Sequence, residues 1–288
     1  MPAAFDPATA DTTLFAALLE AARRHGSSKV ILEDAERTPL TYKRLILGAL
    51  VLGGKLAEET RRSENVGVLL PNVNGLAVTL FGLNAFGRVA AMLNFTAGLK
   101  NLRSAVATGV IGTVVTSRRF IDIAKLEDVV AGLAETETAG GRKLRIVYLE
   151  DVRKRISTGD KLRGVARSML AARVHRRHGL RPEQAAVILF TSGTEGAPKG
   201  VVLSNRNLVA NARQIFAHAD GMLTAADTVM NPLPMFHSFG LTAATLMPVL
   251  NGMKVVLYPS PLHFKQVPGL IRATGATVLF ATDTFMQG

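Results

Sequence analysis

Residues 185–204 read AAVILFTSGTEGAPKGVVLS and form the most informative stretch of the chain. The apolar, partly β-branched residues 185–190 predict a buried strand that ends directly before Thr191. The next ten residues, TSGTEGAPKG, are rich in Gly, Ser and Thr and contain one lysine. Such a loop offers unobstructed N–H groups and hydroxyls to phosphate oxygens, and Lys199 supplies the opposing charge. We therefore predict a strand that leads into a phosphate-binding loop.

The alternation of short apolar runs and longer amphipathic segments continues on both sides of this stretch. Strands are predicted at 66–70, 89–93, 113–115, 144–149, 186–190, 229–233, 254–258 and 277–280. Helices are predicted at 73–86, 118–133, 205–218 and 264–273, and another begins after Thr12 and Thr13 and stops at Gly26. This rhythm predicts a doubly wound α/β fold with mostly parallel sheets.

A seam is expected near Gly179–Gln184, where a basic helical stretch (160–178) ends and a strand begins. We predict two α/β halves, residues 1–180 and residues 181–288, with the phosphate loop in the second half. The last apolar strand is followed by Phe285 and Met286 and then by Gly288, without a terminal helix or polar tail. We therefore expect the second half to be an incomplete domain.

Two familiar nucleotide-binding motifs do not fit the loop. In a P-loop, G-x-x-x-x-G-K-[ST], Pro198 would occupy the place of the second glycine and Gly200 that of the Ser or Thr. The residues after the loop also favour a strand rather than a helix whose N-terminus could bind phosphate. A dinucleotide fingerprint needs two glycines spaced two apart, and the chain has none. A turn-rich hairpin without binding function remains a competing interpretation of the loop.

The composition limits the class of protein. The 288 residues are 48% hydrophobic and 19% charged, typical of a globular protein, and the absence of cysteine excludes disulfides and Cys-ligated zinc. We expect a cytoplasmic protein without a secretory signal. The apolar stretch from Val66 to Phe95 is interrupted by Pro71 and several asparagines and glycines, so we expect a buried strand–helix–strand rather than a membrane span.

Most of the net charge of +12 lies between Arg142 and Arg181, a stretch that contains thirteen Lys and Arg residues and three acidic residues. This stretch contains one aromatic residue, Tyr148, and no recognition motif, so we expect no nucleic-acid binding. Leu162, Val165, Met169 and Leu170 lie on one face of its predicted helix. An anionic membrane surface, an acidic carrier protein and a solvated structural helix all remain open for it, with a peripheral membrane location implied by the first.

The string TSGTEGAPKG resembles the phosphate-binding loop of the adenylate-forming superfamily, which usually reads T-S-G-T-T-G-x-P-K-G. Glu195 is the departure, and it resembles a narrower branch, the acyl-[acyl carrier protein] synthetase half of bacterial 2-acylglycerophosphoethanolamine acyltransferases. Segments 70–98, 115–122, 147–151, 233–242, 256–264 and 277–285 support that branch. The resemblance begins near Leu14 and implies the large N-terminal domain of the family, truncated at its C-terminal end.

The resemblance implies roles for individual residues. The residues around the ATP β- and γ-phosphates would be Thr191, Ser192, Gly193, Thr194, Glu195, Gly196 and Lys199. His237 would lie beside the carboxylate to be activated, although a lone histidine among aromatic residues is ordinarily a packing or capping residue. The residues lining the acyl site would be Phe236, Phe239, Gly240, Leu241, Thr242, Thr282 and Thr284, with simple core packing as the alternative for the aliphatic ones. No residue is assigned as a direct metal ligand, and Glu195 is expected to face magnesium or solvent.

The implied reaction has two steps. A fatty-acid carboxylate attacks the α-phosphorus of Mg-ATP to give acyl-adenylate and pyrophosphate, and a phosphopantetheine thiol of acyl carrier protein or coenzyme A then takes the acyl group. The family's adenine, ribose and catalytic-lysine segments have no counterpart in these residues, so we expect residues 1–288 alone to be inactive. A non-catalytic module that retains the loop is the alternative. Chain length of the acid, acceptor and oligomeric state do not follow from the sequence.

Overall fold

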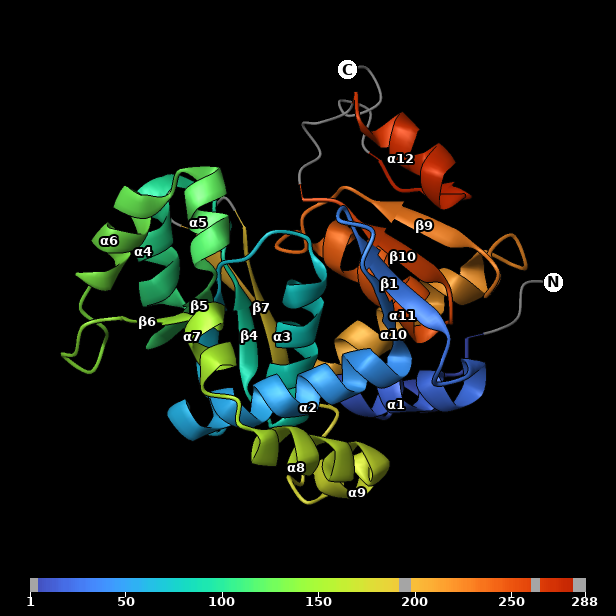
Figure 1. The fold of residues 1–288 in the computed structure, drawn as a ribbon, viewed down its shortest axis with the longest axis horizontal. Helices are drawn as coiled ribbons and strands as arrows, with labels where there is room; N and C mark the ends of the chain where they lie inside the picture. Colours follow the sequence, from blue (N-terminus) through green and yellow to red (C-terminus); the bar gives the residue numbers. More distant parts are fainter. Residues whose placement is uncertain (1–4, 192–197, 260–264, 282–288) are drawn as a thin grey trace.

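The structure is a computed structural model that describes residues 5–191, 198–259 and 265–281 (Figure 1). It contains two predominantly parallel sheets with helices between and around them, so the predicted α/β class is confirmed. Eight short apolar runs predicted as strands all lie in these sheets. The stretch from Val66 to Phe95 forms strand, helix and strand, as expected, and no described helix is both long and apolar enough to cross a bilayer.

The larger sheet has six strands in the order β6-β5-β3-β4-β7-β8. Its strands are β3 (Asn65–Val68), β4 (Val89–Met92), β5 (Thr113–Thr116), β6 (Arg145–Tyr148), β7 (Ala185–Thr191) and β8 (Lys199–Ser204). All neighbours are parallel except β7 and β8, which form an antiparallel hairpin. The chain moves from β3 to β4 on one side and then crosses to β5 on the other, so the order reverses between β3 and β5.

The second sheet has five strands in the order β11-β9-β10-β1-β2. Its strands are β1 (Val30–Asp34), β2 (Pro39–Thr41), β9 (Thr228–Asn231), β10 (Lys254–Leu257) and β11 (Val278–Leu279). The strands β1 and β2 were not predicted. Each sheet contains strands from before and after residue 180. The two sheets therefore do not coincide with the predicted halves 1–180 and 181–288, and the division of the chain into two domains stays a prediction.

The helices enclose the sheets in layers (Figure 1). They are α1 (Leu14–His25), α2 (Tyr42–Glu59), α3 (Asn74–Ala85), α4 (Gly98–Thr108), α5 (Arg118–Ala124), α6 (Glu127–Ala134), α7 (Leu149–Lys154), α8 (Thr158–Met169), α9 (Ala171–Arg176), α10 (Asn205–His218), α11 (Met247–Leu250) and α12 (Val267–Thr274), with the 3-10 turn η1 (Pro7–Ala10) and the π-helix η2 (Phe239–Leu246). Helix α3 contacts strands of both sheets, and its neighbour α2 crosses it closely. A side chain at Gly53 would lie 2.4 Å from the carbonyl oxygen of Gly82, so this crossing requires glycine.

One predicted helix is wrong in its extent. Residues 118–133 form two helices, α5 and α6, rather than one. Lys125 takes a left-handed conformation with φ of 53°, and its N–H bonds to the carbonyl of Asp122, which closes α5. The apolar pattern continues through this break because both helices pack on the same face of the sheet, where Phe120, Ile121, Val130 and Leu133 share one core.

The two sheets are joined at the carboxyl ends of their strands by the buried side chain of Asn72, which follows β3. Its Oδ1 accepts a hydrogen bond of 3.0 Å from the N–H of Met235, and its Nδ2 donates to the carbonyl of Leu233. Both of those residues follow β9 in the other sheet. A side-chain amide can bond to a carbonyl and to an N–H at the same time. The side chain of Asn72 therefore fixes the loop after β9 against the edge of the larger sheet.

A second buried amide, Asn231 at the end of β9, shapes the same loop from within. Its Oδ1 accepts from the N–H of Leu233 at 3.0 Å, and its Nδ2 donates to the hydroxyl of Thr245 at 2.8 Å. That hydroxyl donates in turn to the carbonyl of Gly240 at 2.8 Å. Buried polar groups that are fully paired specify one geometry, so this network fixes the path of the chain from β9 into η2.

A buried histidine attaches α9 to the N-terminal part of the chain. Nδ1 of His175 lies 3.0 Å from the carbonyl oxygen of Ala85 and must donate to it, and Nε2 lies 2.7 Å from the hydroxyl of Thr13. The ring also packs against Phe15, with centroids 5.1 Å apart. Burial lowers the pKa of His175 below its ordinary value of 6.5, so the ring is neutral in the folded protein at neutral pH.

We expect Asn231→Ala to lower the free energy of unfolding by about 1–3 kcal/mol, because buried partners then lose their hydrogen bonds. Urea unfolding followed by circular dichroism measures this change. The matched control is Asn101→Ala on α4, whose exposed side chain bonds only to the carbonyl of Ala97 within its own helix. An equal loss of stability in the two variants would contradict the role of the network.

Stability should fall as the pH decreases below about 6.5, because the unfolded chain then binds protons that folded His175 does not. The contribution is complete above pH 6.5, and its slope reaches at most about 1.4 kcal/mol per pH unit. Urea unfolding between about pH 5 and pH 7.5 should therefore give a shallower pH dependence for His175→Gln. The pKa values of His25, His178 and His237 are also lowered, and these residues remain in the variant, so the difference between variant and wild type reports His175 together with its effect on the nearby His178. Parallel curves for the two proteins would exclude the assignment.

Candidate active site

The candidate site lies where the carboxyl ends of the two sheets meet. In open α/β sheets, ligands bind at the carboxyl ends of the strands where the strand order reverses. In the larger sheet this point falls between β3 and β5. Asn72 follows β3, and Phe95 follows β4, the other neighbour of β3. Asn72 holds the loop after β9, and Phe95 contacts Phe236 in that loop, so residues of both sheets surround one edge.

The ends of the predicted phosphate loop are brought together by the β7–β8 hairpin. Thr191 and Lys199 are direct partners in the antiparallel register, and both are exposed. Strand β7 runs parallel to β4, so this pair lies at the same edge as Phe95. The structure thus contains the hairpin of the competing interpretation, but it ends at the edge where ligands bind in this class of fold.

Lys199 carries the charge that a phosphate site needs. Within the described ranges it has no ion pair, so none of the described carboxylates neutralises its ammonium group. An exposed lysine that has no ion pair with another described residue suits an anionic phosphate. Of the other predicted phosphate-binding residues, Ser192, Gly193, Thr194, Glu195 and Gly196 lie outside the described residues.

His237 lies in the loop after β9 and is exposed to solvent. Its ring contacts Phe236 edge-on, with centroids 4.7 Å apart, and no described residue forms a hydrogen bond with the imidazole. Neighbouring atoms nevertheless desolvate the ring and lower the pKa of His237 below 6.5. Its imidazole is therefore a neutral group with free donor and acceptor capacity, which differs from the bonded, buried state of His175.

A row of aromatic rings links His237 to the larger sheet. Phe236 is T-shaped to Phe95 at 5.1 Å, and Phe95 is T-shaped to Phe120 at 5.0 Å. Phe95 packs against the cores on both sides, and Phe236 is buried. Beyond their apolar area, such edge-to-face pairs stabilise by about 0.5–1.5 kcal/mol each. The row therefore forms an apolar wall beside His237.

The other predicted acyl-site residues fall into three groups. Phe239 is 41% exposed, and its ring lies 5.6 Å from that of Phe280 after β11. Leu241 and Thr242 are buried in η2, where Leu241 belongs to the main core. Thr282 and Thr284 lie outside the described residues. Only Phe239 and Phe236 are thus placed beside other aromatic rings of this edge, and an acyl role for the buried residues stays a prediction.

Gly240 has a steric role that the sequence did not reveal. A side chain there would lie 2.3 Å from the carbonyl oxygen of Pro234 and 2.6 Å from that of Leu233. The chain therefore passes directly under the turn formed by residues 234–237. A π-helix is rare and occurs frequently at functional sites, and η2 starts at the residue before Gly240.

Three residues of this edge were not predicted: Asn72, Asn231 and Phe95. Each follows or ends a buried strand, and that position was the available signal. An asparagine after an apolar run is ordinarily interpreted as a turn residue, and its partners lie far away in the sequence. No group of three His, Asp or Glu in the described part of the chain could hold a metal ion, so a metal site among those residues is not indicated.

Comparisons with known proteins identify the family and the fold. The profile of the family described as "AMP-binding enzyme" matches residues 18–288, nearly the whole chain. Among relatives, the acyl-CoA ligase sidI of Beauveria bassiana is 28% identical over 263 residues, which are 88% of this chain and 43% of that protein. A long-chain-fatty-acid–CoA ligase of Bacillus subtilis is 38% identical over 74 residues, or 26% of this chain and 13% of that protein. The chain thus spans less than half the length of these relatives.

A solved structure has the same fold. The inhibitor-bound N-terminal domain of FACL13 from Mycobacterium tuberculosis superposes with a TM-score of 0.74 over 96% of this chain and 64% of that chain, at 18% identity. This likeness supports the fold, and the family profile supports the membership. The chain belongs to the AMP-binding enzyme family.

Proposed function

We propose that this chain forms the ATP-phosphate and carboxylate-binding part of an acid–thiol ligase that activates a fatty acid as an acyl-adenylate. The observation that carries the proposal is the convergence of the Thr191–Lys199 hairpin end and the loop bearing His237 at one sheet edge. The names of the relatives, an acyl-CoA ligase and a long-chain-fatty-acid–CoA ligase, support this reaction class.

The described residues suit ATP in one respect. Lys199 offers an exposed ammonium without a carboxylate partner among the described residues, at the end of a hairpin whose loop is rich in Gly, Ser and Thr. Bound ATP supplies the electrophilic α-phosphorus and pyrophosphate as a leaving group. Lys199 then neutralises phosphate charge, and the hydroxyl of Thr191 is available as a donor to a phosphate oxygen. Mg²⁺ is proposed from the resemblance alone, because the described residues offer no cluster of ligands for it.

The carboxylate end is assigned to His237. A neutral imidazole can donate one hydrogen bond to a carboxylate oxygen and hold it in position without protonating it, which preserves the attacking oxygen as a nucleophile. The apolar rings of Phe236, Phe95 and Phe239 provide a surface for the first methylenes of the acyl chain. This combination favours an acid with an aliphatic chain over a small polar acid.

The second step transfers the acyl group to a phosphopantetheine thiol. The thiol attacks the acyl carbon, the thioester bond forms, and the bond to AMP breaks. We propose coenzyme A or acyl carrier protein as the source of the thiol, since both present the same chemical group. Residues 1–288 are proposed to bind substrates, and the activity belongs to the whole ligase.

We expect Lys199→Ala to weaken ATP binding about 10-fold to 100-fold, because a charge-assisted hydrogen bond to phosphate is lost. Isothermal titration calorimetry of residues 1–288 measures the affinity. Lys100→Ala, which removes an exposed lysine from α4, is the matched control and should bind ATP like the wild type. Equal affinities for wild type and Lys199→Ala would exclude the phosphate role.

We expect His237→Ala to weaken fatty-acid binding about 10-fold, while the exposed His218→Ala on α10 leaves it unchanged. Displacement of a fluorescent fatty acid measures this affinity. Binding of ATP without binding of fatty acid would favour a nucleotide-binding module instead. Fatty-acid-dependent ATP–pyrophosphate exchange by residues 1–288 alone would contradict the expectation that the activity needs the whole ligase.

A further inference from the structure

Helix α8 presents its apolar side chains to solvent. The exposed fractions are 67% for Leu162, 46% for Val165 and 81% for Met169, and Leu170 at the end of the helix is 52% exposed. The first three occupy positions i, i+3 and i+7, which fall on one face of an α-helix. A surface helix ordinarily turns such a face toward the core. We call these four residues the α8 stripe.

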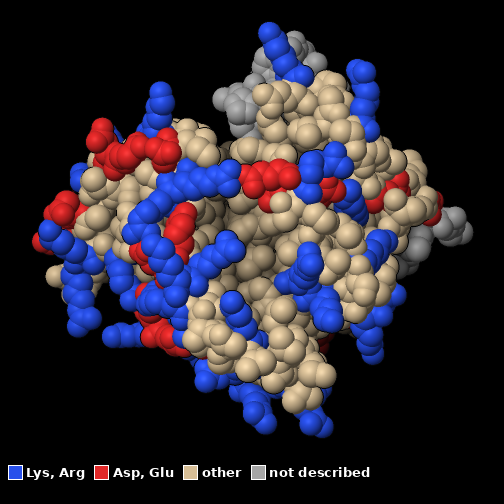
Figure 2. All heavy atoms as spheres, viewed as in Figure 1, with Lys and Arg blue, Asp and Glu red and all other residues tan. Residues whose placement is uncertain are grey.

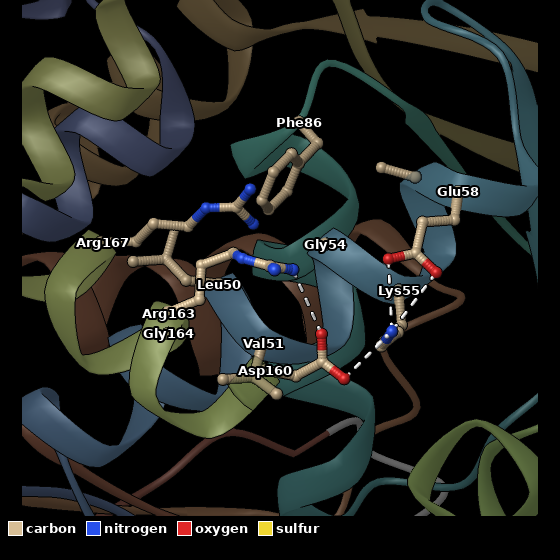
Figure 3. Close-up of a pocket in the computed structure, with 11 residues that line it drawn as sticks. Leu50, Val51, Gly54, Lys55, Glu58, Phe86, Asp160, Arg163, Gly164 and Arg167 are labelled. Atoms are coloured by element: carbon tan, nitrogen blue, oxygen red, sulfur yellow. Dashed lines mark hydrogen bonds and ion pairs between the residues drawn. The ribbon is translucent and has the colours of Figure 1, made fainter. Parts of the chain in front are cut away.

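The opposite face of α8 packs on α2 (Figure 3). Gly164 is the buried residue of α8, and a side chain there would lie 2.2 Å from Cγ2 of Val51. Close contact with α2 therefore occurs at a glycine rather than at a large apolar residue. The large apolar residues of α8 are left for another partner.

Charged groups complete this interface. Lys55 of α2 pairs with Asp160 at 3.1 Å, and Arg163 pairs with the same carboxylate at 3.3 Å. The guanidinium of Arg167 lies 5.7 Å from the ring centroid of Phe86, above a hollow of about 190 Å³ between the helices (Figure 3). Asp160 and Arg167 thus face the protein while the large apolar side chains of α8 face water, the reverse of the usual arrangement.

Basic side chains surround the α8 stripe. Lys161, Arg173, Arg176 and Arg177 are exposed, and within the part of the chain that the structure describes none of them has an ion pair. Figure 2 shows Lys and Arg side chains projecting at the lower end of the molecule, where α8 and α9 lie in Figure 1. The carboxylates that the structure describes therefore leave these four cations unneutralised.

We propose that the face formed by the α8 stripe and these four basic residues binds the surface of an anionic lipid bilayer. A helix that lies in the membrane interface inserts an apolar face below the headgroups and places Lys and Arg among the phosphates. The α8 face supplies both parts, and the charge of the rim is complementary to anionic headgroups. The residues involved differ from those of the proposed ligase site.

The position of α8 is compatible with a working active site. Phe86, which lines the hollow under α8, follows α3 and precedes β4, so α8 lies at the amino ends of the strands. The candidate site lies at their carboxyl ends. A bilayer against α8 therefore leaves the site uncovered.

The binding test uses purified residues 1–288 and sedimentation with vesicles. We expect binding to phosphatidylcholine vesicles that contain about a third phosphatidylglycerol, weak binding to pure phosphatidylcholine, and loss of binding as NaCl rises from about 0.1 M to 0.5 M. The triple variant Leu162→Ser, Val165→Ser, Met169→Ser should lower the partition coefficient about a hundredfold. Lys161→Glu and Arg173→Glu should each lower it at least fivefold, since each removes one cation near the surface.

Matched controls come from other surfaces. Ile123→Ser removes an apolar residue of α5 that is 69% exposed, and Lys100→Glu reverses an exposed charge on α4. Neither should change vesicle binding. Circular dichroism and ATP titration of every variant verify that the fold and the proposed ligase site are intact, so failure of this proposal is distinguishable from failure of the ligase proposal.

The insertion of α8 can be observed directly because the chain contains no tryptophan. Met169→Trp places a single fluorophore in the α8 stripe, and Ile123→Trp places one on α5. We expect a blue shift of the emission with anionic vesicles for Met169→Trp alone, and quenching of that emission by brominated lipids.

Five results would overturn the proposal. The first three are equal binding of the wild type and the triple serine variant, absence of binding to anionic vesicles, and an unshifted emission of Met169→Trp. The other two are self-association through the α8 stripe and binding to an acidic carrier protein, each without binding to vesicles, which would assign the face to a protein partner.

Discussion

The side-chain amide of Asn72 is the interaction on which the geometry of the candidate site depends. It is the buried group that hydrogen-bonds from the end of β3 to the loop after β9, and it satisfies both a carbonyl and an N–H of that loop. Without it, the described contacts of the loop that carries Phe236 and His237 with the larger sheet would be apolar ones. Apolar contacts hold two surfaces together but do not fix their register, whereas paired hydrogen bonds do.

The rest of this edge follows from that fixed register. With the loop in place, Asn231 and Thr245 hold the path into η2, and Gly240 permits the chain to pass directly under the turn. Phe236 then reaches Phe95, which lies beside the hairpin that ends in Thr191 and Lys199. Hydrogen bonds and apolar contacts thus act at different points of the same edge. At its rim, the imidazole of His237 has no hydrogen bond to any other described residue.

Much of the fold was predictable because most elements have local signals. The apolar runs of the eight predicted strands are short and bounded by breakers, and α10 begins and ends at the predicted residues. Strand β1 was missed because VILED contains only three apolar residues and its partner β10 lies far along the chain. The break between α5 and α6 depends on the left-handed conformation of one lysine, for which no residue type gave a signal. In the candidate site, motif similarity identified Lys199 and His237, but Asn72 could not be found because its partners are more than 160 residues away.

The parallel pairing of β1 with β10 also has a consequence for biosynthesis. Leu32 lies beside Val255, so the first strand to leave the ribosome has to wait for a neighbour made roughly 220 residues later. At about 5–20 residues per second, this interval lasts on the order of tens of seconds. During that time the emerging segment is an apolar strand with one open side, a substrate for chaperones that bind nascent chains. The six-stranded sheet can be completed earlier, because its strands β3 to β8 follow one another in the sequence. Its helix α3, which contacts β1 in the folded protein, can then cover β1 before β10 is made.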